Sequence, residues 1–299
     1  MKIVVTGRIG QLVRSLVEAA GARTDVEVVT AGRPEMDLGE PTTAAAHILS
    51  FHPDVVINAA AYTAVDAAED DQDEARRINA AAPEALAAAT ARSGVRFVQI
   101  STDYVYDGLG EGAYDEQTPP APLGVYGRTK LEGELRALAA NPETVILRTA
   151  WVYSPFGRNF LRTMMALAQV RRVLTVVGDQ NGSPSYAPDL ATAILALTDR
   201  WRNVPTLALG QAYHVAGSGS TSWAGFAECI MRECAANGLA SAEVRPIRTE
   251  DWPTKAVRPR NSVLDCAKFA RDVGYAAPVW QDSTRRAVAR IAAEHIVEA

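Results

Sequence analysis

Short apolar runs alternate with alanine-rich, amphipathic stretches through the first half of the chain. The apolar runs are rich in β-branched residues, as buried strands are, and they lie at residues 2–7, 26–32, 54–61, 95–102 and 144–153. Between the first two runs, Leu12, Val13, Leu16 and Val17 fall on one face of a predicted helix, which Gly21 ends. Strands this apolar, separated by helices, predict a doubly wound α/β fold, in which helices cover both faces of a parallel, Rossmann-type sheet.

The pattern becomes less regular further along the chain. Residues 73–94 still predict a helix, with a kink or break at Pro83. After Trp151, helical patterns are separated by loops rich in glycine and proline. We therefore expect a dinucleotide-binding domain formed by residues 1–150 and about 180–213, and a smaller, mixed substrate-binding lobe formed by residues 151–179 and 214–299.

Composition narrows the possible partners. A chain of 299 residues that is 48% apolar can bury a large core, and its net charge of −5 argues against a nucleic-acid partner. Cys229, Cys234 and Cys266 are odd in number and widely spaced, which favours buried thiols in a reducing compartment. The four histidines form no cluster with ligand spacing, so we expect no metal site. We also expect no signal peptide and no membrane partner, and hence a cytoplasmic protein.

The first strand runs into a candidate cofactor turn, KIVVTGRIGQLVRSL. Gly7 would allow the tight turn, and Gly10 would let the backbone approach a pyrophosphate at the helix N-terminus. Val13 stands where a third glycine normally permits close packing of helix on strand, so we expect weaker but retained cofactor binding. A turn without any ligand is the alternative interpretation.

The end of the second strand bears on the choice of cofactor. An NAD-preferring site would place an acid there, but Thr30, Ala31 and Gly32 are followed by Arg33. The guanidinium of Arg33 suits the 2′-phosphate of NADP, although a solvated loop arginine is the alternative. We therefore predict NADPH as the cofactor and leave acceptance of NADH open.

Two segments carry candidate catalytic chemistry. Tyr126 and Lys130 are four residues apart, on one helical face, where the ammonium would lower the pKa of the phenol enough for proton transfer. An ordinary surface pair is the alternative. Upstream, Ser101 and Thr102 end a strand and could hydrogen-bond a reacting oxygen, with Asp103 and Tyr104 placed to meet substrate hydroxyls.

Several motifs occur together with these residues, in the order VTGRIGQL, NAAAYTAVDAAE, STDYVYDG, YGRTKLEGE, LRTAWVYSPFGRNF, NGSPSYAPDLA and SVLDC. In them the chain resembles the extended short-chain dehydrogenase/reductases, and within these the dTDP-4-dehydrorhamnose reductase family, over nearly its whole length. The resemblance implies transfer of a hydride from NADPH to the C4 ketone of dTDP-6-deoxy-L-lyxo-4-hexulose, giving dTDP-L-rhamnose. Val13 departs from the family pattern, which has glycine there.

The resemblance also implies the roles of individual residues. The catalytic set is Thr102, Tyr126 and Lys130, since Thr102 lies 24 positions before Tyr126 as the family pattern requires. Tyr126 and Lys130 would contact the cofactor as well. Further cofactor contacts are implied at Gly10, Gln11, Leu12, Asp37, Leu38, Ala61, Tyr62 and Thr63. Substrate contacts are implied at Val65, Thr102, Asp103, Tyr104 and Trp151.

Some readings remain open at this point. Trp151 could pack on the sugar or thymine as a flat platform, or it could be a core residue. Arg258 and Arg260 could neutralise the substrate diphosphate, or they could be solvated surface residues. A sugar-nucleotide epimerase or dehydratase on the same scaffold and a non-catalytic binding homologue are the alternative functions. We expect the chain to form a homodimer.

Overall fold

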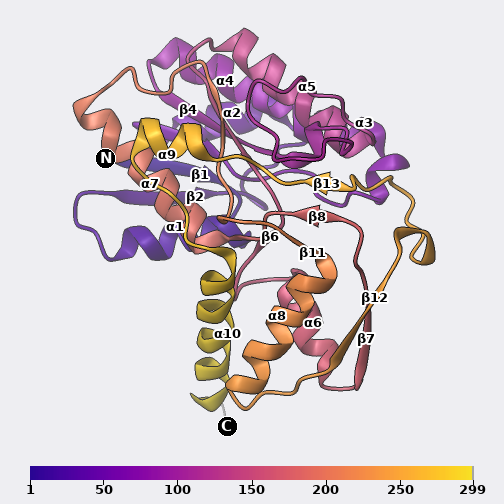
Figure 1. Ribbon diagram of the computed structural model, residues 1–299. Coiled ribbons are helices and arrows are strands. Elements are labelled where there is room, and N and C mark those ends of the chain that lie inside the picture. Colours follow the sequence, from indigo (N-terminus) through magenta and orange to yellow (C-terminus); the bar gives the residue numbers. More distant parts are fainter. Residues whose placement is uncertain (298–299) are drawn as a thin grey trace.

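The computed structural model describes residues 1–297, built around a parallel six-stranded sheet (Figure 1). The strands lie in the order β10-β5-β4-β3-β1-β2. They are β1 (Lys2–Thr6), β2 (Glu27–Ala31), β3 (Val55–Asn58), β4 (Arg96–Thr102), β5 (Val145–Thr149) and β10 (Ala212–His214). β1 pairs with β2 on one side and with β3 on the other, so the strand order reverses between β1 and β3. Doubly wound folds bind ligands at such a reversal, at the carboxyl ends of the strands. The predicted doubly wound fold is confirmed.

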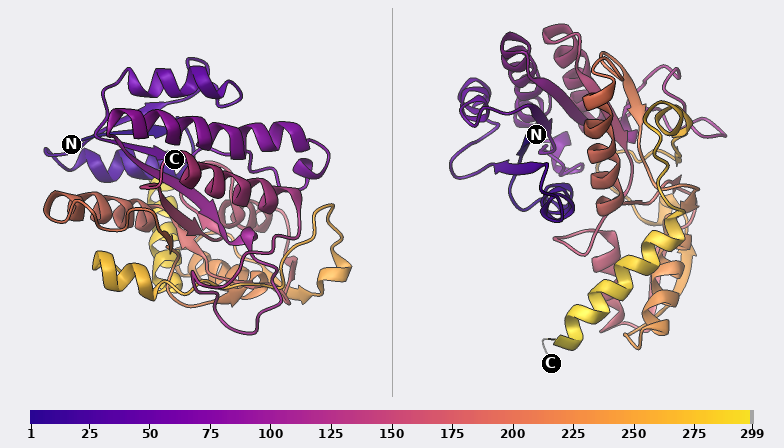
Figure 2. Two further views of the ribbon diagram at one scale, coloured as in Figure 1. Left: turned by 90° about the horizontal axis from the view of Figure 1, so that it is seen from above. Right: turned by 90° about the vertical axis from the view of Figure 1, so that its left-hand side faces the viewer.

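Helices cover both faces of this sheet (Figure 2). One face packs against α1 (Gln11–Gly21), α7 (Ala187–Asn203) and α9 (Ala267–Val273). The other face packs against α2 (Pro41–Leu49), α4 (Ala82–Ser93) and α5 (Val125–Ala140). The strand interiors are completely buried at Ile3, Val4 and Val5, which is why their sequences are apolar on both faces instead of alternating.

The long helix predicted around Pro83 changes its register there. Residues 72–93 are helical throughout, as α3 (Gln72–Arg76), a π-helical turn η2 (Arg77–Ala81) and α4. Proline has no N–H to donate to the carbonyl of Asn79, four residues earlier, so that carbonyl is free of the usual bond. Gly133 of α5 lies directly against it, where any Cβ would collide. The expected kink is thus a π-helical turn that brings α5 close.

A second hydrophobic cluster lies beside the sheet domain. It is formed by α6 (Phe160–Ala168), β7 (Val173–Val177), α8 (Trp223–Ala236), β12 (Glu243–Ile247) and α10 (Trp280–Val297). Short strands β8 (Asn181–Gly182), β11 (Thr221–Ser222) and β13 (Asn261–Ser262) form a small mixed sheet next to it. The remaining short elements are η1 (Ala67–Glu69), η3 (Asp103–Val105), β6 (Val152–Tyr153), β9 (Ser185–Tyr186) and η4 (Thr249–Asp251).

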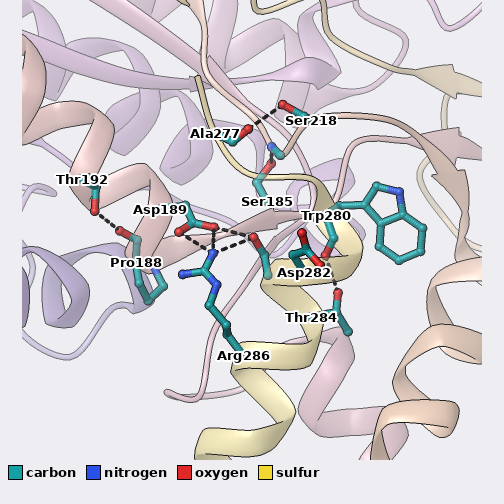
Figure 3. Close-up of polar contacts among 12 residues, drawn as sticks. Ser185, Pro188, Asp189, Thr192, Ser218, Ala277, Trp280, Asp282, Thr284 and Arg286 are labelled. Carbon is teal, nitrogen blue, oxygen red and sulfur yellow. Dashed lines mark hydrogen bonds and ion pairs between the residues drawn. The ribbon is translucent and has the colours of Figure 1, made fainter. Parts of the chain in front are cut away.

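An ion pair with a buried carboxylate joins α10 to the start of α7 (Figure 3). The Asp189 carboxylate, in the first turn of α7, accepts hydrogen bonds from Arg286 at 2.6 and 2.8 Å and from the Ser283 hydroxyl at 2.5 Å. Its side chain is only 9% exposed, so these donors replace the water that the carboxylate loses. This contact fixes the second cluster on the sheet domain.

Candidate active site

The predicted catalytic residues come together at the carboxyl end of β4. Thr102 is the last residue of β4 and lies opposite Thr149, the last residue of β5. Helix α5 begins beside this edge, because the Glu69 carboxylate accepts the backbone N–H of Val125 at 2.8 Å. Glycine at position 127 allows the helix to touch the carbonyl of Tyr104, where a Cβ would collide. Tyr126 is therefore placed against the segment that follows Thr102.

Thr102 and Asp103 form a small hydrogen-bonded unit. The Thr102 hydroxyl donates to Oδ1 of Asp103 at 2.9 Å and accepts the backbone N–H of Tyr104 at 3.2 Å. Both side chains are buried. Burial raises the pKa of Asp103 to about 6, although the nearby hydroxyls of Ser262 and Thr102 oppose the shift.

Buried polar atoms without partners gather around this unit. Among the described residues, the atoms of this kind at the ends of β4 and β5 are Ser101 Oγ, Asp103 Oδ2 and Thr149 Oγ1. Leaving such groups unpaired costs about 1–3 kcal/mol each, so proteins rarely keep them without a reason. Their clustering marks this edge of the sheet as a place that a polar ligand would complete.

Tyr126 and Lys130 share a face of α5, but Lys130 does not lower the pKa of Tyr126. The Lys130 ammonium donates to the carbonyl oxygen of Ile100 at 2.7 Å. Burial raises the pKa of Tyr126 to about 12, although the nearby Thr102 hydroxyl acts to lower it. Burial also lowers the pKa of Lys130 to about 8, while Glu134 raises it. The pKa of Tyr126 is thus set by burial, and the expected lowering by the ammonium of Lys130 is not found.

Trp151 follows β5 in a conformation that few non-glycine residues adopt, with φ of +47°. Its indole lies parallel to that of Trp223 on α8, with 3.5 Å between ring centroids, and its Nε1 donates to Ser262 at 3.1 Å. Gly182 lies against Cε2 and Nε1 of the indole, where a Cβ would collide. Trp151 is therefore held rigidly at the border of the two clusters.

The candidate cofactor turn is open to solvent. Gly7 has φ of +99°, and Gly10 is the N-cap of α1, whose first turn holds no acidic residue. The first N–H groups of a helix have no acceptor within the helix, so they can bind an anion here. Val13 is 2% exposed, and its Cγ2 lies 3.3 Å from where a Cβ on Gly7 would be. The valine fills the space beneath the turn without blocking its outer face.

Gln11 connects this turn to the segment after β5. Its side-chain amide donates to the carbonyl of Val152 at 3.2 Å, and its oxygen accepts from Ser154 at 2.8 Å and from Asn159 at 2.9 Å. Leu12 and Leu38 are buried in the core. Asp37 is exposed and accepts the N–H of Gly39 at 2.8 Å.

The loop after β3 carries Ala61, Tyr62, Thr63 and Val65. Asn79, in the π-helical turn, accepts the N–H of Tyr62 at 2.9 Å and donates to its carbonyl at 3.1 Å. The same amide donates to Thr129 on α5 at 3.1 Å. One side chain thus fixes the loop relative to the helix that carries Tyr126. The sequence analysis did not single out Asn79. The available signal was Pro83, four residues later, which leaves the carbonyl of Asn79 without its usual helical hydrogen bond.

The two arginines expected near the substrate lie in different places. Arg258 donates to Asp66 at 2.7 Å, and its charge opposes the rise that burial causes in the pKa of Tyr104. Arg260 is 72% exposed, 3.6 Å from Glu250, and lines a cavity of about 710 Å³ with Asn181 and Asn261. Asn181 precedes Gly182 in β8, and Asn261 precedes Ser262 in β13. Because successive side chains of a strand point to opposite faces, the cavity lies on the face opposite Gly182 and Ser262, which touch Trp151. Arg260 thus lies at this exposed cavity, and its contact with a substrate diphosphate stays a prediction.

Arg33 is exposed and has no ion-pair partner within residues 1–297. Close by, Arg8 pairs with Glu35, a contact that the sequence pattern did not indicate. All three cysteines are free. The part of the chain that the structure describes holds no cluster of His, Cys, Asp or Glu suited to a metal ion. None of its helices is both long and apolar enough to cross a membrane.

Known proteins are similar to this chain in sequence and in fold. A family model described as the RmlD substrate binding domain matches residues 1–293. A dTDP-4-dehydrorhamnose reductase of Sinorhizobium fredii is 42% identical over 288 residues, which cover 96% of this chain and 97% of that protein. The crystal structure of such a reductase from Clostridium acetobutylicum matches with a TM-score of 0.89 and 35% identity, covering 100% of both chains.

A reductase from Bacillus anthracis, solved in complex with NADP, matches with a TM-score of 0.87 and 31% identity, covering 100% of this chain and 99% of that one. These similarities run over the sheet, the candidate cofactor turn and the second cluster together. The chain therefore belongs to the RmlD family, that of the dTDP-4-dehydrorhamnose reductases.

Proposed function

We propose that the protein reduces the C4 ketone of dTDP-6-deoxy-L-lyxo-4-hexulose to give dTDP-L-rhamnose, with NADPH as the hydride donor. The observation that carries the proposal is the placement of Thr102 and Tyr126 beside three unpartnered, buried polar atoms at the sheet edge. Family membership supports the identity of the substrate, because the relative from Sinorhizobium fredii is named a dTDP-4-dehydrorhamnose reductase.

The residues of the turn fit a dinucleotide. Gly7 has the positive φ that the turn requires, and the free N–H groups at the start of α1 suit a pyrophosphate. Gly10, Gln11 and Leu12 would hold the pyrophosphate through their backbone, while Tyr126 and Lys130 would hold the nicotinamide ribose. Remaining cofactor contacts are proposed at Arg33, Asp37, Leu38, Ala61, Tyr62 and Thr63. When bound, NADPH supplies the hydride.

Side chains of the protein transfer the proton and orient the ketone. Because burial raises the pKa of Tyr126 to about 12, its phenol is protonated at neutral pH and can donate to the alkoxide oxygen as it forms. Thr102 orients the carbonyl by a hydrogen bond from its hydroxyl, which turns from Asp103 to the substrate oxygen. The charge of Lys130 stabilises the phenolate left behind, once a ligand draws the ammonium away from Ile100.

Other residues would hold the sugar nucleotide. Asp103 and Tyr104 would bind sugar hydroxyls, with the free Oδ2 of Asp103 as one acceptor. Trp151 would supply a flat apolar face. Val65, in the loop after β3, would make a further contact with the substrate. Arg258 retains a buried Nη1 without a partner after pairing with Asp66, and this N–H suits a phosphate oxygen.

We propose further that the second hydrophobic cluster is the substrate-binding lobe, with α9 counted with the sheet domain because Phe269 and Val273 join its core. A cytoplasmic location is supported by three free thiols. A homodimer is the assembly we propose, and light scattering of the purified chain would measure it.

NADPH oxidation, followed by absorbance with the ketosugar generated in situ, tests the proposed function. We expect turnover by the parent protein and a loss of at least about 100-fold in kcat for Tyr126→Phe, which keeps the ring but removes the proton. No turnover with NADPH bound would instead favour an epimerase or dehydratase. Neither turnover nor NADPH binding would favour a non-catalytic homologue.

A further inference from the structure

Two oppositely charged side chains meet at the carboxyl end of β2. Arg8, from the turn between β1 and α1, makes an ion pair with Glu35, from the loop after β2. Their side chains are 45% and 54% exposed, so both are within reach of a ligand. A backbone N–H and the Arg8 guanidinium lower the pKa of Glu35, which keeps it a carboxylate at neutral pH.

The backbone fixes Arg8 in this position. The N–H of Gly7 donates to the carbonyl of Ala31, the last residue of β2, at 2.6 Å. A Cβ on Gly32 would lie 3.1 Å from Cγ of Arg8 and 3.1 Å from Cα of Gly7. The stem of Arg8 therefore lies over Gly32, and the ion pair with Glu35 holds its partly exposed guanidinium at the end of β2.

This edge is where a dinucleotide presents its adenosine ribose. In doubly wound folds the residues that follow the second strand contact the ribose 2′-position, an acid binding a hydroxyl and an arginine a phosphate. Here the acid is Glu35, which lies after Thr30, Ala31 and Gly32, the positions where an NAD-preferring site would place it. Arg8 comes from a different loop, and the exposed Arg33 stands between them in sequence.

We propose that Arg8 is the residue that selects NADPH, by binding the 2′-phosphate, and that Glu35 is its competitor, which accepts the 2′-hydroxyl of NADH. This inference rests on the proposed function. A 2′-phosphate would take the guanidinium of Arg8 from Glu35, since the fork of an arginine matches phosphate oxygens as well as a carboxylate. With NADH, the ion pair stays closed and Glu35 accepts the hydroxyl.

Calorimetric titration of the full chain with 2′,5′-ADP and with 5′-AMP tests this directly, because the two probes differ only in the 2′-phosphate. We expect Arg8→Met to weaken 2′,5′-ADP about 10- to 100-fold and 5′-AMP less than about twofold. Glu35→Gln should tighten 2′,5′-ADP several-fold, because it removes the competing charge, and should weaken 5′-AMP. Arg245→Met is the matched control, since Arg245 pairs with Glu243 at a similar exposure on β12.

Equal losses for both probes in Arg8→Met would overturn the proposal, because they would indicate a general effect on the turn. So would a loss confined to Arg33→Met, which would give the phosphate to Arg33 alone. A parent protein that fails to distinguish the two probes would overturn it as well. These titrations need no ketosugar, so selective binding by Arg8 would stand even if the turnover assay failed.

Discussion

The indole of Trp151 lies flat against that of Trp223, with 3.5 Å between ring centroids and 6° between ring planes. Trp223 begins α8, so a residue of the second cluster holds the proposed substrate platform at the end of β5. The positive φ of Trp151 costs about 1–3 kcal/mol, and this stack, with the bond to Ser262, offsets that cost.

Replacing Trp223 should therefore impair substrate binding more than chemistry. An aromatic pair contributes about 0.5–1.5 kcal/mol beyond its buried area, so we expect Trp223→Leu to raise KM for the sugar nucleotide about 3- to 10-fold. The KM for NADPH should not change, and Trp223→Phe should restore most of the loss. Trp252→Leu, at an exposed tryptophan outside the stack, is the control. An unchanged KM for the sugar nucleotide in Trp223→Leu would show that the stack does not position Trp151.

Asp103→Asn should stabilise the protein at neutral pH while it impairs activity. The pKa of Asp103 is about 6 in the folded chain and ordinarily 3.8, so folding is penalised as pH rises through the window between these values. Asparagine keeps the acceptor for Thr102 and removes the penalty, which is about 3 kcal/mol above pH 6. Urea unfolding at pH 7.5 and at pH 4 should show a gain at the higher pH only.

Asp115→Asn is the matched control, with the opposite sign. A hydrogen bond from Thr118 lowers the pKa of Asp115, so that carboxylate stabilises the folded chain above its ordinary pKa and the effect is lost as pH falls. A stability gain for Asp103→Asn that is equal at both pH values would rule out titration of Asp103 as its origin.

Glu134 and Arg148 form a buried ion pair behind Lys130. Their atoms approach to 2.6 Å, with side chains 3% and 7% exposed. Arg148→Met would leave the carboxylate buried and unpaired, so we expect a loss of about 3–5 kcal/mol in the free energy of unfolding. The double variant Glu134→Leu with Arg148→Met should recover much of this loss.

The exposed pair of Glu84 and Arg136, at 2.9 Å, provides the comparison, and Arg136→Met should cost less than about 1 kcal/mol. Chemical denaturation measures both pairs. A cost for Arg148→Met no greater than that for Arg136→Met would mean that water reaches Glu134 freely.

Val13→Gly should tighten NADPH binding but destabilise the fold. The valine packs beneath Gly7 in the core, and glycine would let α1 move closer to β1, as in the usual three-glycine turn. Loss of the buried side chain and the low helix propensity of glycine should together cost about 2–4 kcal/mol. Fluorescence titration with NADPH checks the first expectation, with Val13→Ala as an intermediate. Unchanged or weaker affinity in Val13→Gly would mean that Val13 does not limit the turn.

The sequence pattern predicted the sheet well because its strands are apolar on both faces and separated by clear helices. Five of the six strands were expected, whereas β10 is only three residues long and carries too little pattern to be found alone. The register change before Pro83 was expected only as a kink, since local sequence indicates the missing N–H but not the helix that packs against the free carbonyl.

The candidate site was predictable where its residues share one element or follow a strand end. Tyr126 and Lys130 share a helix, and Thr102 and Asp103 end β4. Trp223 beside Trp151 and Arg8 beside Glu35 join segments far apart in the chain, so no local pattern indicated them. The effect of Lys130 on Tyr126 was misjudged for a related reason: spacing shows that two groups are close but not how far burial desolvates them.

The central claim is that a hydride passes from NADPH to C4 of the sugar nucleotide without return. NADPH with both C4 hydrogens of the nicotinamide replaced by deuterium, incubated with the ketosugar, tests it most directly through NMR and mass spectrometry of the product. The account predicts one deuterium at C4 of the sugar for each NADPH oxidised, and no labelled product with Tyr126→Phe. A sugar without deuterium, formed with no net oxidation of NADPH, would contradict it.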